Sequence, residues 1–340
     1  MRTEPERMEL LPQRAPGSWR VLATVFAALI ALAVLLRLVD PVRFAWSSNF
    51  LLVFNALLIE ATPFILLGAL VSAAIEVFMS PRAFASLARI PRPLQLPAAA
   101  LAGVAFPVCE CGSVPVARRL AAKGLSPGAA ITFMLAAPVA NPVVIASTYV
   151  AYKGRPILWT MVLGRLGLGV VVAMCAGWVV SRQTKDELLK PRPDDSLEDD
   201  HDHEHGEGRM KEYFGHVGND FVFMGRFLIL GAAVAAAVQT FLPQSIIDPV
   251  ANTPVVSQLA MMGLAFILSL CSESDAFVAA SFVQFSASAQ LAFLVFGPMV
   301  DTKLSALYMG TYNRGFLRTI VITVTAVTLV GTLWIGIVFG

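Results

Sequence analysis

The stretch Phe106–Pro115 reads Phe-Pro-Val-Cys-Glu-Cys-Gly-Ser-Val-Pro, and a second polar stretch, Leu270–Phe277, reads Leu-Cys-Ser-Glu-Ser-Asp-Ala-Phe. Both interrupt strongly apolar surroundings. Thiols, carboxylates and hydroxyls are costly within hydrocarbon, so clusters of them usually line a pathway or a site. Two such clusters at matching places of two halves indicate a transporter formed by duplication, with its substrate site between the halves.

The similarity between the halves extends beyond these clusters. Phe64–Val71 resembles Phe227–Val234, and Ala137–Pro142 resembles Gly297–Thr302, in the same order and with nearly constant spacing. We therefore divide the chain into an N-terminal tail and extra helix at 1–49, a first repeat at 50–182, a cytoplasmic His/Asp-rich linker at 183–218 and a second repeat at 219–340.

The composition places the chain in a membrane. Of its 340 residues, 57% are hydrophobic and only 14% are charged, fewer charges than a soluble domain carries. Several apolar segments reach the roughly 18–20 residues needed to cross a bilayer. We predict an all-α polytopic membrane protein with no cofactor, no nucleic-acid partner and no enzyme activity. The segments are Val21–Val39, Phe50–Met79, Ser126–Val150, Pro156–Val180, Asn219–Leu242, Val255–Phe285, Ser288–Tyr308 and Arg318–Phe339.

The positions of Lys and Arg decide between two topologies, because positive charges collect on the cytoplasmic side. If segments 97–119 and 255–285 both cross the membrane, the charges outside the apolar segments divide equally between the two sides. If both are re-entrant hairpins, most of these charges fall on one side, and Arg37, Arg43, Lys153 and Arg155 remain on the other. We therefore predict inverted repeats with about seven spanning helices, two re-entrant hairpins and a cytoplasmic N-terminus; about nine full spans are the alternative.

The cysteines are the candidate substrate ligands. Cys109, Cys111 and Cys271 could converge from two hairpins, and thiolates prefer soft centres such as Cu(I), Zn(II) and, by the same softness, trivalent arsenicals. Free cysteines are also among the most buried residue types, and a packing role is what we expect for Cys175 among Val, Ala and Met. Polar neighbours of the thiols, namely Ser113, Asn141 and Ser272, are further candidate substrate contacts.

Acidic side chains near the clusters are candidate proton carriers, because a carboxyl group buried in a membrane can bind and release a proton near neutral pH. Asp301 and Lys303 could pair across a turn, either for proton coupling or as a structural ion pair. We expect packing or snorkelling roles for Arg165 and Arg226. The candidate proton-coupling set is Glu110, Glu273, Asp275, Asp301, Lys303 and Glu60.

Two proline-containing motifs and the linker complete the pattern. Pro138-x-x-Asn141-Pro142 and Pro298-x-x-Asp301 predict helix breaks at matching places, where exposed helix ends can contact a substrate. The polar segment 185–218 is predicted to be disordered. Its alternating His and acidic residues suggest a loose Zn(II) site, with a solvated acidic tether as the alternative. The candidate metal ligands are His201, His203 and His205.

The motif at 106–120, Phe-Pro-x-Cys-Glu-Cys-Gly-x-x-Pro-x-x-x-x-Leu, is followed by Ala-Pro-x-x-Asn-Pro at 137–142 and Cys-Ser-x-x-Asp-Ala-Phe at 271–277. These motifs resemble the bacterial predicted-permease family that includes organoarsenical efflux permeases of the ArsP type. The resemblance covers the chain from about residue 50 onward and implies a multi-pass permease of the bacterial inner membrane. It also implies that cysteines bind trivalent organoarsenicals, a role that maps onto Cys109, Cys111 and Cys271.

Function is therefore predicted at two levels. We expect a secondary transporter, because the chain has no GxxxxGK phosphate loop with which to hydrolyse ATP. Trivalent organoarsenicals are the leading substrate, with export coupled to protons. A Zn or Cu ion transporter is the first alternative. A membrane thiol oxidoreductase is the second, although redox pairs more often use CxxC than the spacing found here. The other expected partners are the lipid bilayer and a second copy in a homodimer.

Overall fold

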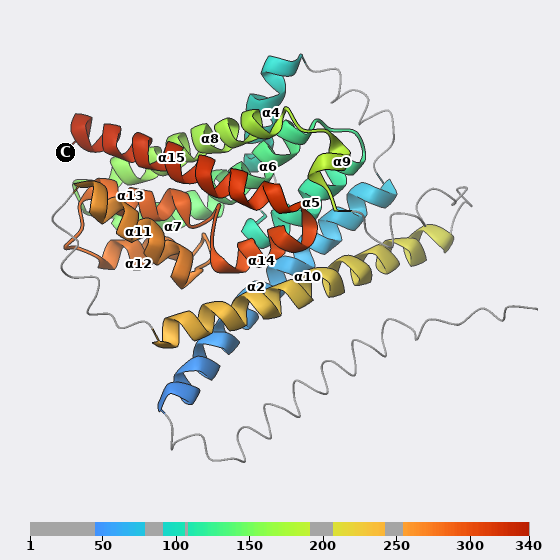
Figure 1. Cartoon of the computed structure of the whole chain (residues 1–340), viewed down its shortest axis with the longest axis horizontal. Coiled ribbons are helices and arrows are strands. Elements are labelled where there is room, and N and C mark those ends of the chain that lie inside the picture. Colours follow the sequence, from blue (N-terminus) through green and yellow to red (C-terminus); the bar gives the residue numbers. More distant parts are fainter. Residues whose placement is uncertain (1–44, 79–90, 106–107, 191–206, 242–253, 340) are drawn as a thin grey trace, which may run out of the picture. The chain divides into compact units, whose positions relative to one another are not determined.

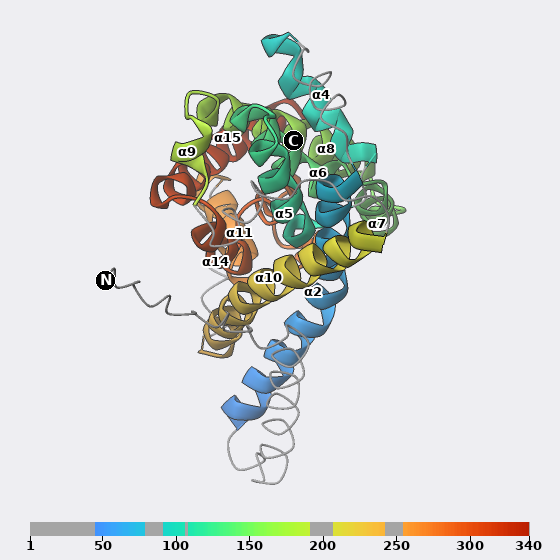
Figure 2. The same ribbon diagram turned by 90° about the vertical axis from the view of Figure 1, so that its right-hand side faces the viewer.

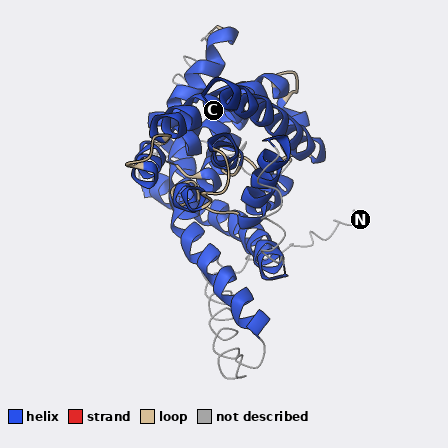
Figure 3. Ribbon diagram, turned by 90° about the vertical axis from the view of Figure 1, so that its left-hand side faces the viewer, coloured by secondary structure: helices blue, strands red, loops and turns tan. Residues whose placement is uncertain are grey.

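The computed structural model describes residues 45–78, 91–105, 108–190, 207–241 and 254–339. Within them the chain is helical apart from turns, short loops and an isolated bridge between Leu189 and Tyr312 (Figures 1 and 3). The predicted first span at 21–39 lies outside the described residues. The helices are α2 (Ala45–Phe78), α4 (Arg92–Ala105), α5 (Glu110–Ala122), α6 (Pro127–Ala140), α7 (Pro142–Tyr152), α8 (Leu158–Val180), α9 (Lys185–Leu188), α10 (Glu207–Phe241), α11 (Pro254–Leu268), α12 (Asp275–Ser281), α13 (Ala287–Phe296), α14 (Thr302–Thr311) and α15 (Arg314–Phe339).

Five stretches of the described helices are long and apolar enough to cross a membrane, and three shorter apolar helices accompany them. All overlap the predicted apolar segments except Leu94–Gly103, which overlaps the predicted hairpin segment 97–119. The prediction of an all-α polytopic membrane protein is therefore confirmed. The spanning stretches are Ser48–Phe78, Pro127–Tyr152, Leu158–Val180, Arg209–Thr240 and Gly315–Val338.

The first predicted hairpin is formed by α4 and α5, which run in opposite directions along α6. At the start of α4, Gln95 accepts a hydrogen bond from Ser126, which caps the start of α6. Near the end of α4, Gly103 lies against Ala137, near the end of α6. Helix α5 begins at that same level, where Ser113 donates to the carbonyl of Met134, and a short turn then joins its end back to α6. The chain thus returns to the level at which it entered, as a re-entrant hairpin requires.

The repeat-related helices α2 and α10 pack antiparallel to each other (Figure 2). Leu57 of α2 lies against Ala232 and Ala235 of α10. Further along α2, Ser72 donates to Asp220, which lies earlier in α10. An antiparallel course of equivalent helices is what an inverted repeat requires. The short helices also pack crosswise between the halves, with α5 against α14 and α7 against α12.

The helix breaks predicted from the proline motifs are confirmed. Asn141 separates α6 from α7 and accepts a hydrogen bond from the N–H of Val143 at 2.9 Å. Asp301 separates α13 from α14 and accepts one from the N–H of Leu304 at 2.6 Å. Both side chains satisfy amide groups that the start of a helix leaves unpaired. The two breaks therefore use the same device in the two repeats.

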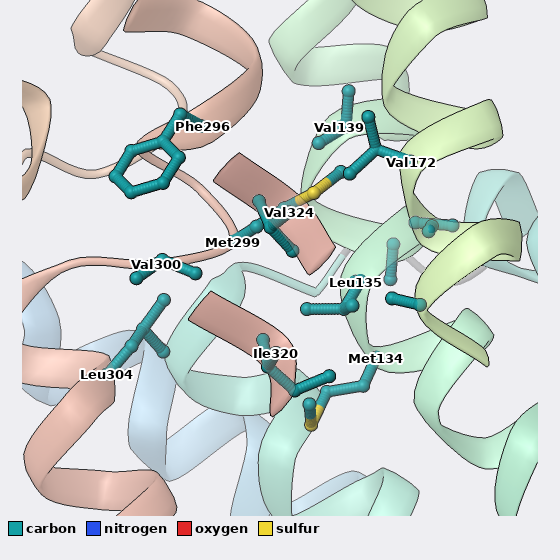
Figure 4. Packing of buried hydrophobic residues seen from close by; sticks show 14 of the residues in the cluster. Met134, Leu135, Val139, Val172, Phe296, Met299, Val300, Leu304, Ile320 and Val324 are labelled. Atoms are coloured by element: carbon teal, nitrogen blue, oxygen red, sulfur yellow. The ribbon is translucent and has the colours of Figure 1, made fainter. Parts of the chain in front are cut away.

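The apolar core lies between the halves (Figure 4). Leu135 from α6 and Val172 from α8 pack with Ile320 and Val324 from α15, and all four side chains are buried. Met299, in the break before α14, joins the same cluster. The broken helices are thus supported by continuous apolar packing on one side, which leaves their polar ends to the site described below.

The linker is shorter than the sequence predicts. Residues 207–218 belong to α10, so the prediction of disorder is wrong there, and the boundary at 219 falls inside a continuous helix. At the other end, α9 is followed by Lys190, whose N–H donates to the carbonyl of Thr311 at 3.2 Å. Tyr213 of α10 donates to the carbonyl of Leu70 in α2, a tertiary contact that supports the extended helix. His201, His203 and His205 lie outside the described residues.

Ion pairs connect the C-terminal end of α5 to α2 and α10. Lys123, just after α5, lies 2.7 Å from a carboxylate oxygen of Glu76 at the end of α2. Arg119 lies 3.3 Å from the same carboxylate and 3.6 Å from Asp220 of α10. Arg119 and Asp220 are both buried, so loss of either side chain would leave an uncompensated charge in the interior. The position of α5, and of the cluster at its start, is thereby tied to α2 and α10.

Two repeat-related glycines allow α2 and α10 to approach the site helices. A Cβ atom at Gly68 would lie 2.4 Å from the Cα of Gly112 in α5, and one at Gly231 would lie 2.8 Å from the Cα of Lys303 in α14. We expect Gly68→Ala and Gly231→Ala each to destabilise the protein by about 1–3 kcal/mol, because the backbones must move apart. Thermal unfolding in detergent, followed by size-exclusion chromatography, measures the effect.

The matched control is Gly225→Ala in α10, where a Cβ atom would meet nothing within 4 Å. That change is expected to leave stability unchanged or slightly raised, because alanine is the better helix former. An equal loss in all three variants would contradict the close-approach argument.

Candidate functional site

The first polar cluster lies at the start of α5. Cys109 is the N-cap residue with an extended backbone, and its carbonyl accepts the N–H of Ser113 at 3.0 Å. Glu110 occupies the first turn, where a negative charge interacts favourably with the helix dipole. Almost all of α5 is buried, so Cys109, Glu110 and Cys111 face protein rather than lipid.

The second polar cluster lies in the break between α11 and α12. The break begins at Ser269, whose φ of 47° is unusual for a residue with a side chain and costs about 1–3 kcal/mol. The Ser269 hydroxyl accepts the N–H of Thr302 at 3.1 Å, which ties the break to the start of α14. After the break, Asp275 begins α12, and its N–H donates to the carbonyl of Cys271 at 3.0 Å.

The two clusters meet where Ser272 contacts Glu110. The hydroxyl of Ser272 donates to Oε2 of Glu110 at 2.9 Å, and the Ser272 N–H lies 3.5 Å from the same oxygen. Both residues are almost fully buried. The other carboxylate oxygen of Glu110, Oε1, has no hydrogen-bond partner among the described residues. The two repeats are thus joined through a buried carboxylate with one oxygen left open.

Arg165, which sequence reasoning assigned to packing or snorkelling, lies at the centre of a buried polar network. Its guanidinium donates to both carboxylate oxygens of Asp275 at 2.8 Å and to the carbonyl of Ser272 at 3.0 Å. A further bond of 2.9 Å reaches the hydroxyl of Thr148 on α7. A snorkelling arginine keeps its charge in water, whereas this one is 2% exposed. Snorkelling is therefore wrong for Arg165.

Arg226 differs from Arg165, since it is exposed on α10. Its guanidinium lies over the ring of Phe223, 4.4 Å from the centroid. Such a stacked arginine at the surface fits the packing role expected for Arg226.

A second buried cation lies beside Cys271. Lys303, in the first turn of α14, has its Nζ 3.9 Å from the Cys271 sulfur and 3.9 Å from Oδ2 of Asp301. All three residues are buried, and Oδ2 of Asp301 has no hydrogen-bond partner among the described residues. The predicted pairing of Asp301 with Lys303 is therefore present, at a longer distance than the Arg165–Asp275 contacts.

The three candidate thiols are free and buried, whereas Cys175 is only half-buried. Cys271 lies beside Lys303 of α14, and α14 packs against α5, which carries Cys111, so thiols of the two clusters belong to elements that meet. In the described part of the chain, no three histidine, cysteine or carboxylate side chains are grouped closely enough to hold a metal ion.

The remaining predicted site residues either lie next to the Glu110–Ser272 contact or have their side chains hydrogen-bonded to backbone groups. Oε1 of Glu60 accepts the Ser274 hydroxyl at 3.0 Å, so α2 also reaches the second cluster. Glu273 is half-buried, with Oε2 3.5 Å from the Ser272 hydroxyl. The hydroxyl of Ser113 donates to the carbonyls of Glu110 and Met134. The side-chain oxygen of Asn141 accepts the N–H of Val143 and so caps α7.

Arg165 and Thr148 are the site residues that sequence reasoning missed. A signal for Arg165 was present, because an arginine in the middle of an apolar segment needs a buried acidic partner. Asp275 is such a partner, but nothing local to either residue indicates the pairing across 110 positions. Thr148 carries no signal of its own in an apolar helix.

Comparison with known proteins identifies the family. The sequence pattern of the family described as "Predicted permease" matches residues 47–337. The chain is 41% identical over 288 residues to the UPF0718 protein YcgR of Bacillus subtilis, covering 83% of this chain and 95% of that protein. It is 32% identical over 288 residues to a putative two-component membrane permease complex subunit of Streptococcus mutans, covering 84% of this chain and 95% of that protein. No solved structure matches. The chain therefore belongs to the predicted-permease family of membrane proteins.

Proposed function

We propose that this permease exports trivalent organoarsenicals, which its buried cysteines bind and its buried carboxylates couple to proton movement. The observation that carries the proposal is the junction between the repeats. There, Glu110, which stands between Cys109 and Cys111, accepts a hydrogen bond from Ser272, which follows Cys271; the three thiols are free and buried, and Oε1 of Glu110 is open. Soft thiol ligands in a buried site favour a soft, thiol-seeking solute over a hydrated ion.

The binding chemistry needs no oxidant or reductant. Methylarsonous acid carries one methyl and two hydroxyl groups on arsenic. Two thiols displace the two hydroxyls, each forming a sulfur–arsenic bond, and each thiol proton leaves with a hydroxyl as water. Cys111 and Cys271 come from the two repeats, so a solute bound to both would bridge the halves. Rocking one repeat against the other then stretches this bridge and exposes it to the opposite side.

Proton coupling is assigned to Glu110 first, because one of its oxygens is engaged by Ser272 and the other is open. A proton taken up at Oε1 removes the charge from the junction and weakens its hold on the second repeat. Glu273 and Glu60, which border the same cluster, are the secondary candidates. Asp275 has both oxygens bound by Arg165, which suits a structural role better.

The test is uptake of methylarsonous acid by everted membrane vesicles, with and without a proton gradient. We expect gradient-dependent uptake in the wild type and its loss in Cys109→Ser/Cys111→Ser/Cys271→Ser, because serine oxygen is a poor ligand for a soft centre. Cys175→Ser is the matched control, since this half-buried cysteine lies outside the polar clusters. It should transport like the wild type.

Other results would redirect the proposal. If neither protein takes up the arsenical, the arsenical assignment fails, and Zn(II) and copper should be measured in the same vesicles. Uptake that survives in the triple variant would remove the thiols from the site.

A protein partner is also proposed for this permease. One relative is named a subunit of a two-component membrane permease complex, so a second membrane protein is a candidate partner for this chain, with a homodimer as the alternative. Cross-linking in native membranes followed by mass spectrometry distinguishes a heteromeric from a homomeric product.

A further inference from the structure

Arg165 makes contacts that neither a simple ion pair nor packing requires. Its two terminal nitrogens engage three acceptors besides Thr148, namely both oxygens of Asp275 and the carbonyl of Ser272. The planar guanidinium matches a carboxylate in this two-pronged way, and an ammonium cannot reproduce it. Arg165 belongs to α8 of the first repeat, whereas Asp275 and Ser272 belong to the second.

Ser272 is consequently held from two sides. Its carbonyl accepts from Arg165 at 3.0 Å, and its hydroxyl donates to Glu110 at 2.9 Å. Its amide nitrogen also faces Glu110, at 3.5 Å. The backbone at this point has no helix to hold it, because α11 has ended and α12 begins only at Asp275. Arg165 thus supplies the restraint that a helix would otherwise provide.

We infer that Arg165 is a positioning residue of the transport site, which fixes the backbone of Ser272 so that its hydroxyl meets Glu110. Asp275 orients the guanidinium for this task and also anchors the start of α12. The inference rests on the proposed function only in treating Glu110 as part of the transport site. The alternative is that Arg165 and Asp275 merely hold the two halves together, in which case their loss would loosen every contact between the halves alike.

The test is a cross-linking rate that needs no substrate. In a chain whose four native cysteines are replaced by serine, Glu110→Cys/Ser272→Cys places two thiols at the junction. Leu57→Cys/Ala232→Cys places two in the apolar contact between α2 and α10. The reagent is the thiol oxidant diamide, which takes up the two thiol hydrogens as each disulfide forms, and the products are identified by proteolysis and mass spectrometry.

Adding Arg165→Lys should slow cross-linking of the 110/272 pair by roughly tenfold, because displacements of about 1 Å strongly affect reactions between positioned groups. The 57/232 pair should react at its original rate. Arg226→Lys, a change of the exposed arginine on α10, should alter neither rate.

A second variant allows the same test if Arg165→Lys does not fold. Arg165→Met/Asp275→Leu removes both charges and leaves apolar side chains of similar size, an exchange that buried ion pairs often tolerate. It should slow the same pair and spare the other. Unchanged cross-linking at 110/272, or equal slowing of both pairs, would overturn the inference. Failure of arsenical uptake in the wild type would leave these rates as they are, so the two proposals fail separately.

Discussion

In vesicles that contain Glu110→Gln, uptake of methylarsonous acid is expected to lose its dependence on the proton gradient almost completely. Glutamine keeps the size of the side chain and an oxygen that can accept the hydroxyl of Ser272, so the contact seen at 2.9 Å can persist. It cannot take up a proton at the position of Oε1, which is open in the wild type. Energised uptake is therefore expected to fall to the level of vesicles without the permease, while the protein remains folded.

The neighbouring carboxylates provide matched controls for Glu110. Glu273→Gln and Glu60→Gln change half-buried side chains at the edge of the same cluster. Each is expected to retain most of the gradient-driven uptake, since neither residue joins the repeats through a short, fully buried hydrogen bond. Loss of coupling in Glu273→Gln together with full coupling in Glu110→Gln would transfer the proton-carrying role to Glu273.

The sequence predicted those parts of the fold that depend on local physical chemistry. Prolines beside Asn141 and before Asp301 cannot continue a helix, and a short polar side chain caps the helix that follows, so both breaks were predictable. The antiparallel pair of α4 and α5 agrees with the distribution of positive charges, and its re-entrant placement in the membrane stays a prediction. The repeat was visible because Gly68 and Gly231 stand in similar surroundings, and each permits a close helix approach.

Other features depend on contacts between distant segments, which no local pattern reveals. Helix α10 continues back to residue 207 because its first turns pack on α2, where the ring of Tyr213 lies tilted against that of Phe78 with centroids 5.7 Å apart. A polar sequence before residue 219 gives no sign of this support. Likewise, Glu110 keeps one carboxylate oxygen without a partner among the described residues, whereas both oxygens of Asp275 are bound by Arg165. This difference depends on how the two halves meet. From the sequence alone, Glu110 and Asp275 were equivalent candidates for proton coupling.

The largest effect on stability is expected from Lys303→Met. The ammonium of Lys303 is the cation that lies 3.9 Å from Oδ2 of Asp301, and both side chains are about 1% exposed. Removing one member of a buried pair leaves an uncompensated charge, which typically costs about 3–5 kcal/mol. The folded yield and the unfolding temperature in detergent should both fall sharply.

The stability lost in Lys303→Met should be restored by giving the second repeat an uncharged helix cap, as Asn141 provides in the first repeat. Asp301 caps α14 through Oδ1, just as Asn141 caps α7, so Asp301→Asn can keep the cap while removing the charge. Lys303→Met/Asp301→Asn is therefore expected to regain most of the lost stability. If the double variant stays as unstable as Lys303→Met, the orphaned charge is not the cause.

The rescued variant separates the contribution of Lys303 to folding from its contribution to the site. Lys303 also lies 3.9 Å from the sulfur of Cys271, and a cation beside a cysteine favours its nucleophilic thiolate form. A stable Lys303→Met/Asp301→Asn protein is thus expected to bind methylarsonous acid poorly, although all its cysteines remain. Wild-type binding by this variant would show that the ammonium serves only to balance Asp301, and that the thiols capture the solute without help from a neighbouring charge.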